Sequence, residues 1–152
     1  MNVTFSASAL LSLLIFFSST VMASEPIPFA DPANSQQIKR GKLIYKRFCS
    51  YCHGHDLQGQ TNWRIRNPDG KLPAPPHDET GHTWHHADDL LFGIIKFGLI
   101  PPYGPENYKT DMPAWGNTLK DADISAVLAY IKSRWPAEIQ KIQSEMNENS
   151  DG

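Results

Sequence analysis

The chain has 152 residues, 40% of them hydrophobic, and a formal net charge of −2 at pH 7. This length predicts one domain, and the charge balance excludes the strongly basic footprint of a nucleic-acid-binding protein. The 12 prolines and 10 glycines predict a loop-rich fold with a modest core, one that suits a central cofactor as filler.

The N-terminal segment has the pattern of an export signal. The first 24 residues carry no charged side chain, and the stretch from Ala7 to Val21 is mostly apolar. Small residues follow up to Ala23, as export peptidases require, so we predict a cleaved signal peptide at residues 1–23, although no Lys or Arg precedes the apolar run. An uncleaved anchor is the alternative, but about fifteen apolar residues fall short of the roughly 20 that span a bilayer.

A Pro-rich, flexible lead-in is expected at residues 24–35. Helical spacing of apolar side chains then predicts three helices, at residues 35–48, 87–97 and 121–134. Asn34 or Ser35 is a suitable N-cap for the first helix.

The segments between and after these helices are expected to be irregular. Residues 54–86 and 99–111 are rich in Gly and Pro, and a loop as long as the first is usually functional. A short extra helix is expected at residues 137–146, followed by a polar, frayed tail at residues 147–152.

The motif with the most chemistry is Cys49-Ser50-Tyr51-Cys52-His53. A C-x-x-C-H run is the covalent attachment signature of c-type haem, in which two thiols bond to the porphyrin vinyl groups and the histidine binds iron. Three other chemistries remain open from these residues alone. They are a disulfide, a redox-active thiol pair, and a zinc site completed by His55.

With these elements in order, the chain resembles the class I mono-haem c-type cytochromes. The resemblance covers about residues 36–135 and defines a cytochrome c domain at 36–136, with residues 137–152 as a C-terminal extension. It depends on four features in the family's order, namely Gly41 with Tyr45, the Cys49–His53 motif, Met112-Pro113, and Tyr130 in the last helix of the domain. The resemblance implies an all-α fold around one covalent haem c, in which the first and last helices cross at Gly41, Tyr45 and Tyr130.

The resemblance also implies which residues hold the cofactor. His53 and Met112 are the expected axial ligands, and Met146 is the other methionine after the signal segment. The second ring nitrogen of His53 is expected to donate to the carbonyl of Pro75 or Pro76. Candidate partners for the haem propionates are the loop residues Trp63, Arg64, Arg66 and Trp84.

A histidine-rich loop offers a second chemistry. His77, His82, His85 and His86 lie close together in the sequence. The last three could ligate copper or zinc, or could give iron a nitrogen in place of Met112. The simpler interpretation is that they are loop residues near a propionate.

The predicted function is electron transfer by a periplasmic monomer that docks transiently with redox proteins. This is a carrier and not an enzyme, since both axial positions on iron would be filled. A basic helix face, Lys39 to Arg47, could steer an acidic partner. The alternatives are a haem subunit of an oxidase or dehydrogenase, including a membrane-bound respiratory complex, and a haem peroxidase or sensor if Met112 does not bind iron.

Overall fold

The computed structural model of the chain describes Met1 and residues 29–150. The predicted signal peptide apart from Met1, residues 24–28 of the lead-in and residues 151–152 of the predicted tail lie outside these residues. Helices account for all regular structure in the described part, which confirms the prediction of an all-α fold. They are α1 (Ser35–Phe48), α2 (Ser50–His53), the 3₁₀ helix η1 (Thr83–His85), α3 (Asp88–Phe97), α4 (Asp121–Lys132) and α5 (Ala137–Ser150). None of the helices described is long and apolar enough to cross a membrane.

Local sequence explains where α1 and α3 begin and end. The Asn34 side chain accepts hydrogen bonds from two backbone N–H groups in the first turn of α1, both at 3.1 Å, and is therefore its N-cap. Two acidic residues, Asp88 and Asp89, open α3, where they complement the helix dipole. Gly98 ends α3 with a φ of +86°, a conformation that glycine adopts without strain.

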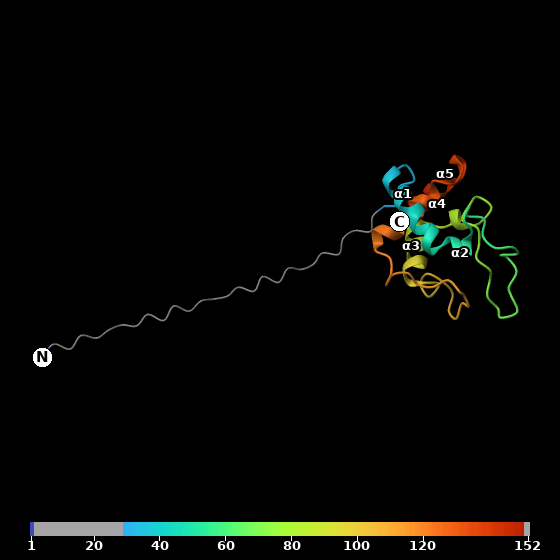
Figure 1. Cartoon of the computed structure of the whole chain (residues 1–152), viewed down its shortest axis with the longest axis horizontal. Helices are drawn as coiled ribbons and strands as arrows, with labels where there is room; N and C mark the ends of the chain where they lie inside the picture. Colours follow the sequence, from blue (N-terminus) through green and yellow to red (C-terminus); the bar gives the residue numbers. More distant parts are fainter. Residues whose placement is uncertain (2–28, 151–152) are drawn as a thin grey trace.

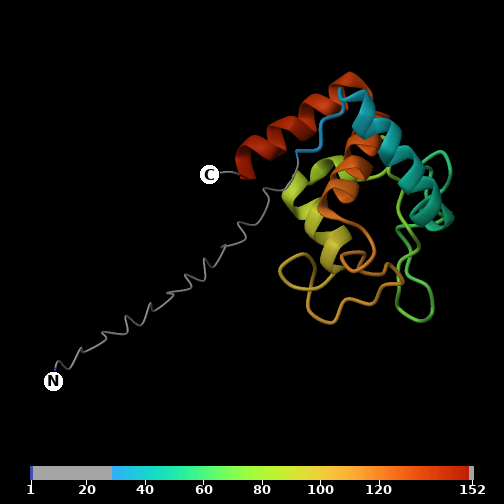
Figure 2. The same cartoon turned by 60° about the vertical axis from the view of Figure 1, so that its left-hand side comes forward.

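The closest helix crossing joins α1 to α4 (Figure 2). A Cβ atom added to Gly41 of α1 would overlap the Ala126 carbonyl oxygen and lie 2.9 Å from Tyr130 Cβ. Beside this point the rings of Tyr45 and Tyr130 meet with centroids 5.4 Å apart. The crossing expected from Gly41, Tyr45 and Tyr130 is therefore present.

Helix α4 is the centre of the hydrophobic core. Ile124 and Leu128 pack with Leu91 and Phe92 of α3, whereas Val127 packs with the cluster that includes Tyr45. Because α4 contributes to both clusters, all of its residues from Ile124 to Lys132 are buried.

The C-terminal helix is longer than the sequence predicts. α5 runs to Ser150, so the expectation of a frayed tail from residue 147 is wrong for residues 147–150. The reason is a buried polar contact, in which the Gln143 amide donates to the His86 carbonyl at 3.2 Å and to Asp88 at 2.8 Å. Asn147 also accepts from the Asp88 backbone N–H at 2.8 Å, which fastens this turn to the start of α3.

The end of the lead-in also packs on the fold. Ala30 is buried in the core cluster with α3 and α4, and the Gln37 side chain bonds the backbone of Phe29 and Asp31, both at 2.9 Å. Among the described residues, the part outside the helices consists mainly of two long loops, between α2 and η1 and between α3 and α4. Both extend from the same end of the helical body (Figures 1 and 2).

Candidate haem site

The Cys49–His53 motif occupies a tight helical turn directly after α1. Cys49 is the C-cap of α1, and its carbonyl accepts a hydrogen bond from the N–H of His53 at 3.0 Å. Cys49 is half-buried, Cys52 is exposed and His53 is buried, and neither cysteine is in a disulfide. Burial, with a smaller contribution from Cys52, raises the pKa of the Cys49 thiol to about 12.

The imidazole of His53 is held by a backbone carbonyl. Its Nδ1 lies 2.9 Å from the Pro75 oxygen. Because a carbonyl oxygen can only accept, Nδ1 carries the proton and Nε2 is left with a free lone pair. Burial lowers the pKa of His53, and the bond to Pro75 opposes that shift only in part. The ring is therefore a neutral imidazole with Nε2 available, which is the form that binds a metal.

Tertiary contacts bring Pro75 to His53 across 22 positions of sequence. The Gln60 N–H donates to the Ala74 carbonyl at 2.9 Å, so the two arms of the loop are hydrogen-bonded to each other. Gly59 has a φ of +67°, and a Cβ atom there would overlap the backbone nitrogen of Pro76. Glycine at position 59 thus permits the close approach that places the Pro75 carbonyl beside His53.

A histidine that the sequence analysis grouped with the other loop histidines, and did not assign to His53, also meets His53. The ring of His77 is stacked on the ring of His53, with centroids 3.9 Å apart and planes at 18°. Burial lowers the pKa of His77 well below its usual value, so this ring is also neutral. The one signal in the sequence was position, since His77 stands two residues after Pro75.

Met112 lies half-buried in the loop before α4. That loop is fastened to α3, because the N–H groups of Trp115 and Gly116 donate to carbonyls in the last turn of α3, both at 2.9 Å. The Trp115 ring also meets Phe48 edge-on, with centroids 5.3 Å apart. Through Phe48 the loop that carries Met112 contacts the residue next to Cys49.

Three of the four propionate candidates lie in the loop after α2, Trp84 lies in η1, and each has partners of its own. The Arg64 guanidinium lies 3.9 Å from the centroid of Trp63, and both residues belong to the loop after α2. The indole N–H of Trp84 donates to the Glu79 carbonyl at 3.2 Å. Arg66 donates to the Gly70 carbonyl at 2.7 Å and lies over the ring of Tyr108, in the second long loop.

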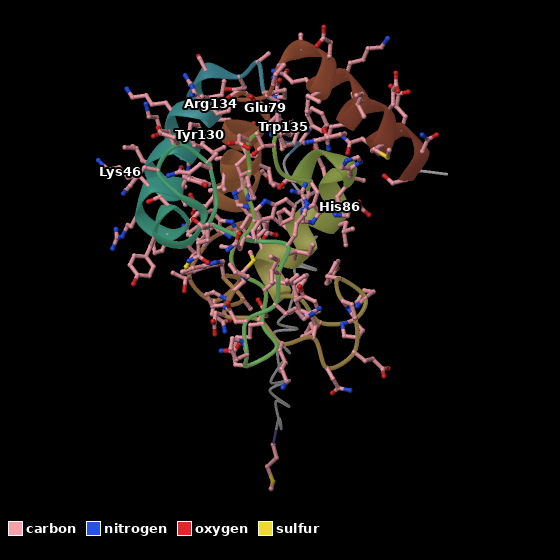
Figure 3. All side chains as sticks on the ribbon, turned by 90° about the vertical axis from the view of Figure 1, so that its right-hand side faces the viewer. Lys46, Glu79, His86, Tyr130, Arg134 and Trp135 are labelled. Carbon is pink, nitrogen blue, oxygen red and sulfur yellow. The ribbon has the colours of Figure 1, made fainter. Side chains whose placement is uncertain are left out.

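His82, His85 and His86 do not converge on one point. Each of them instead packs against a neighbouring ring. His82 stacks on Trp63 with planes at 8°, and His85 stacks on Trp84 with centroids 3.6 Å apart. His86, which is labelled in Figure 3, meets His82 edge-on, with ring centroids 5.5 Å apart. Residues 29–150 contain no group of three His, Cys, Asp or Glu side chains arranged to hold a metal ion, so the copper and zinc hypotheses gain no support.

The donors that the fold assembles suit a covalently bound haem. Cys49 and Cys52 are free thiols on one helical turn, and between them they can form two thioether bonds. His53 follows directly, with Nε2 unprotonated because Nδ1 is committed to Pro75. Two thiols and one neutral imidazole in this order fit haem c.

Comparisons with known proteins agree with this donor set. Residues 36–131 match the family described as cytochrome c oxidase, cbb3-type, subunit III. The chain is 29% identical over 99 residues to the cbb3-type cytochrome c oxidase subunit CcoP of Azospirillum sp. (strain B510). It is 26% identical over 110 residues to the quinohemoprotein alcohol dehydrogenase ADH IIB of Pseudomonas putida.

These relatives are much longer proteins. The alignments cover 65% and 72% of this chain but only 29% of the oxidase subunit and 13% of the dehydrogenase. No solved structure matches the chain. The family match, however, takes in more than half of the chain and includes the Cys49–His53 motif. The chain therefore belongs to the cbb3-type cytochrome c oxidase subunit III family, and it is a c-type cytochrome with covalently attached haem c.

Proposed function

We propose that this chain is a periplasmic mono-haem electron carrier in which His53 and Met112 are the two axial ligands. Bound haem c supplies one-electron chemistry, because its iron cycles between Fe(II) and Fe(III). The observation that carries the proposal is the bond from His53 Nδ1 to the Pro75 carbonyl, at 2.9 Å. That bond fixes the tautomer, orients the ring and makes Nε2 a more basic ligand.

Met112 is the proposed second ligand because of the loop that carries it. The loop is tied to the end of α3 by two backbone hydrogen bonds of 2.9 Å and to α1 by the contact between Trp115 and Phe48. A thioether held in this way favours reduced iron and raises the reduction potential. With both axial positions filled there is no open position for a substrate, which favours a carrier over an enzyme.

The remaining assignments complete the same proposal. Residues 1–23 would direct export and be removed, and transient redox partners would dock to the monomer. Arg64 is the stronger propionate candidate, because its guanidinium donates no hydrogen bond within the described residues. Trp84 is the weaker one, since its indole N–H already donates to Glu79.

A second candidate is a fixed haem subunit or domain of a larger redox assembly. The matched family and the CcoP relative belong by name to cytochrome c oxidase, and the other relative is a quinohemoprotein dehydrogenase. Purification from the native membrane under mild detergent tests this. A carrier is recovered free of the membrane fraction, whereas a subunit co-purifies in fixed ratio with an oxidase or dehydrogenase.

Absorption spectra test the axial ligands. We expect a c-type alpha band in the reduced protein and, in the oxidised protein, a weak sulfur-to-iron charge-transfer band near the red end of the visible range. Met112→Ala should abolish the weak band and keep the alpha band. Met146→Ala is the matched control, because Met146 is exposed on α5, and it should change neither band.

Two results would contradict the proposal. Wild-type protein that binds carbon monoxide rapidly when reduced at neutral pH would indicate an open position on iron, as in a peroxidase or sensor. Loss of the charge-transfer band in Met146→Ala, but not in Met112→Ala, would show that Met146 and not Met112 is the ligand.

A further inference from the structure

The flat face of His77 is the closest aromatic partner of the proposed iron ligand. The His53 and His77 rings are stacked with centroids 3.9 Å apart, and Tyr45 meets His77 edge-on at 5.8 Å. His53 is therefore restrained in two directions. Pro75 holds one edge of its ring through Nδ1, and His77 covers one face.

The backbone places His77 independently of its side chain. Its N–H donates to the Leu57 carbonyl at 2.7 Å, and its carbonyl accepts the indole N–H of Trp135, also at 2.7 Å. The backbone of His77 is thus held on one side by Leu57, in the same loop, and on the other by Trp135, which follows α4.

Hydrogen bonds to the described residues do not explain why a histidine ring stands here. His77 Nδ1 is shielded from solvent and has no hydrogen-bond partner in the described part of the chain. Leaving a buried polar group unpaired costs free energy, which an apolar residue at this place would avoid. The contact that remains to be explained is the stack on His53.

We propose that His77 is a positioning residue for the axial ligand, and that its ring limits rotation of the His53 imidazole about the bond to iron. This inference rests on the proposed function only in taking His53 as the ligand. The orientation of an axial imidazole plane decides which iron d orbital it overlaps. In oxidised haem, that orientation sets how unpaired spin is distributed over the four ring methyl groups.

Proton NMR of the oxidised holoprotein with cyanide added provides the test. Cyanide is cylindrical, so when it takes the sixth position the pattern of the four haem methyl shifts reports the His53 plane alone. We expect His77→Leu, which removes the flat ring, to change the order or spread of the four shifts. His77→Phe, which restores a flat ring, should bring the pattern back toward wild type.

Trp135→Phe is the control for a merely structural effect. It removes the hydrogen bond to the His77 carbonyl and lowers stability, but it leaves the stacked ring in place, so the methyl pattern should stay close to wild type. The proposal is overturned if His77→Leu leaves the pattern unchanged, or if His77→Phe and Trp135→Phe alter it as much as His77→Leu does.

Failure of this inference and failure of the carrier proposal look different. The cyanide adduct does not depend on Met112, so an unchanged pattern in His77→Leu removes the role of His77 alone. Absence of the charge-transfer band from the oxidised wild-type protein would instead contradict the proposal of a His53/Met112 carrier.

Discussion

The ammonium group of Lys132, the last residue of α4, lies 2.6 Å from the carboxylate of Asp88, the first residue of α3. The Lys132 side chain is only 6% exposed and that of Asp88 is 20% exposed. The same carboxylate accepts from Gln143 at 2.8 Å, so one buried ion pair joins α3, α4 and α5. Removing either partner would leave a charge in a place where water cannot easily solvate it.

We therefore expect Lys132→Ala to lower the free energy of unfolding by about 3 kcal/mol, the lower end for a broken buried pair, because Asp88 keeps some contact with water. Chemical denaturation of the holoprotein measures this. The matched control is Lys96→Ala, which breaks the more exposed pair with Asp121 and should cost less than about 1 kcal/mol. Equal losses in the two variants would show that burial does not determine the effect.

Gly41→Ala should strongly destabilise the protein. Alanine favours a helix over glycine by about 1 kcal/mol, but a methyl group at position 41 would overlap the Ala126 carbonyl. Overpacking a core costs about 1–3 kcal/mol, and a clash with backbone atoms lies at the upper end, so the clash outweighs the propensity. Leu43→Ala, on an exposed position of the same helix, should change stability by only about 0.5 kcal/mol. Thermal unfolding followed by circular dichroism compares the two.

Gly59→Ala should raise the reduction potential. A methyl group at position 59 would push Pro76 away and lengthen the bond from His53 to Pro75, which makes His53 a weaker donor to Fe(III). Spectroelectrochemical titration measures the shift. Gly70→Ala is the control, because Gly70 also has a positive φ but its nearest neighbour outside its own turn is the Lys109 side chain. A similar shift of the reduction potential in Gly70→Ala would show that backbone strain, and not the bond from His53 to Pro75, causes the effect.

Stability should fall as the pH drops below about 6.5, the value for a free histidine. Burial lowers the pKa of both His82 and His86 in the folded protein. Between the folded and unfolded pKa values the unfolded chain binds more protons, so acid favours unfolding, and above about 7 both states are neutral.

The variant His82→Gln/His86→Gln tests this origin. It should reduce the loss of unfolding free energy between about pH 7.5 and pH 5 by less than about 1 kcal/mol, since both rings are partly exposed. Denaturation curves for wild type and variant at the two pH values give the difference. An identical pH dependence would show that these two rings do not contribute.

The sequence alone determined the elements with strong local signals. The apolar spacing and the end signals of α1, α3 and α4 depend on residues a few positions apart, and the structure has these helices within about two residues of the predicted bounds. The Cys49–His53 motif indicated haem c for the same reason, because its five residues are contiguous and each has a chemical role, and the order of Gly41, Tyr45, Met112 and Tyr130 around it favoured haem over a disulfide or zinc.

Only the tertiary structure decided which distant residues meet. The sequence offered Pro75 or Pro76 as the candidate, and the close approach at Gly59 selects the Pro75 carbonyl for His53. His77 looked like one of several loop histidines until the fold stacked it on His53. The helical end of α5 was missed because a buried polar contact of Gln143, and not local propensity, holds it. Such contacts join segments that are tens of residues apart, and no local pattern records them.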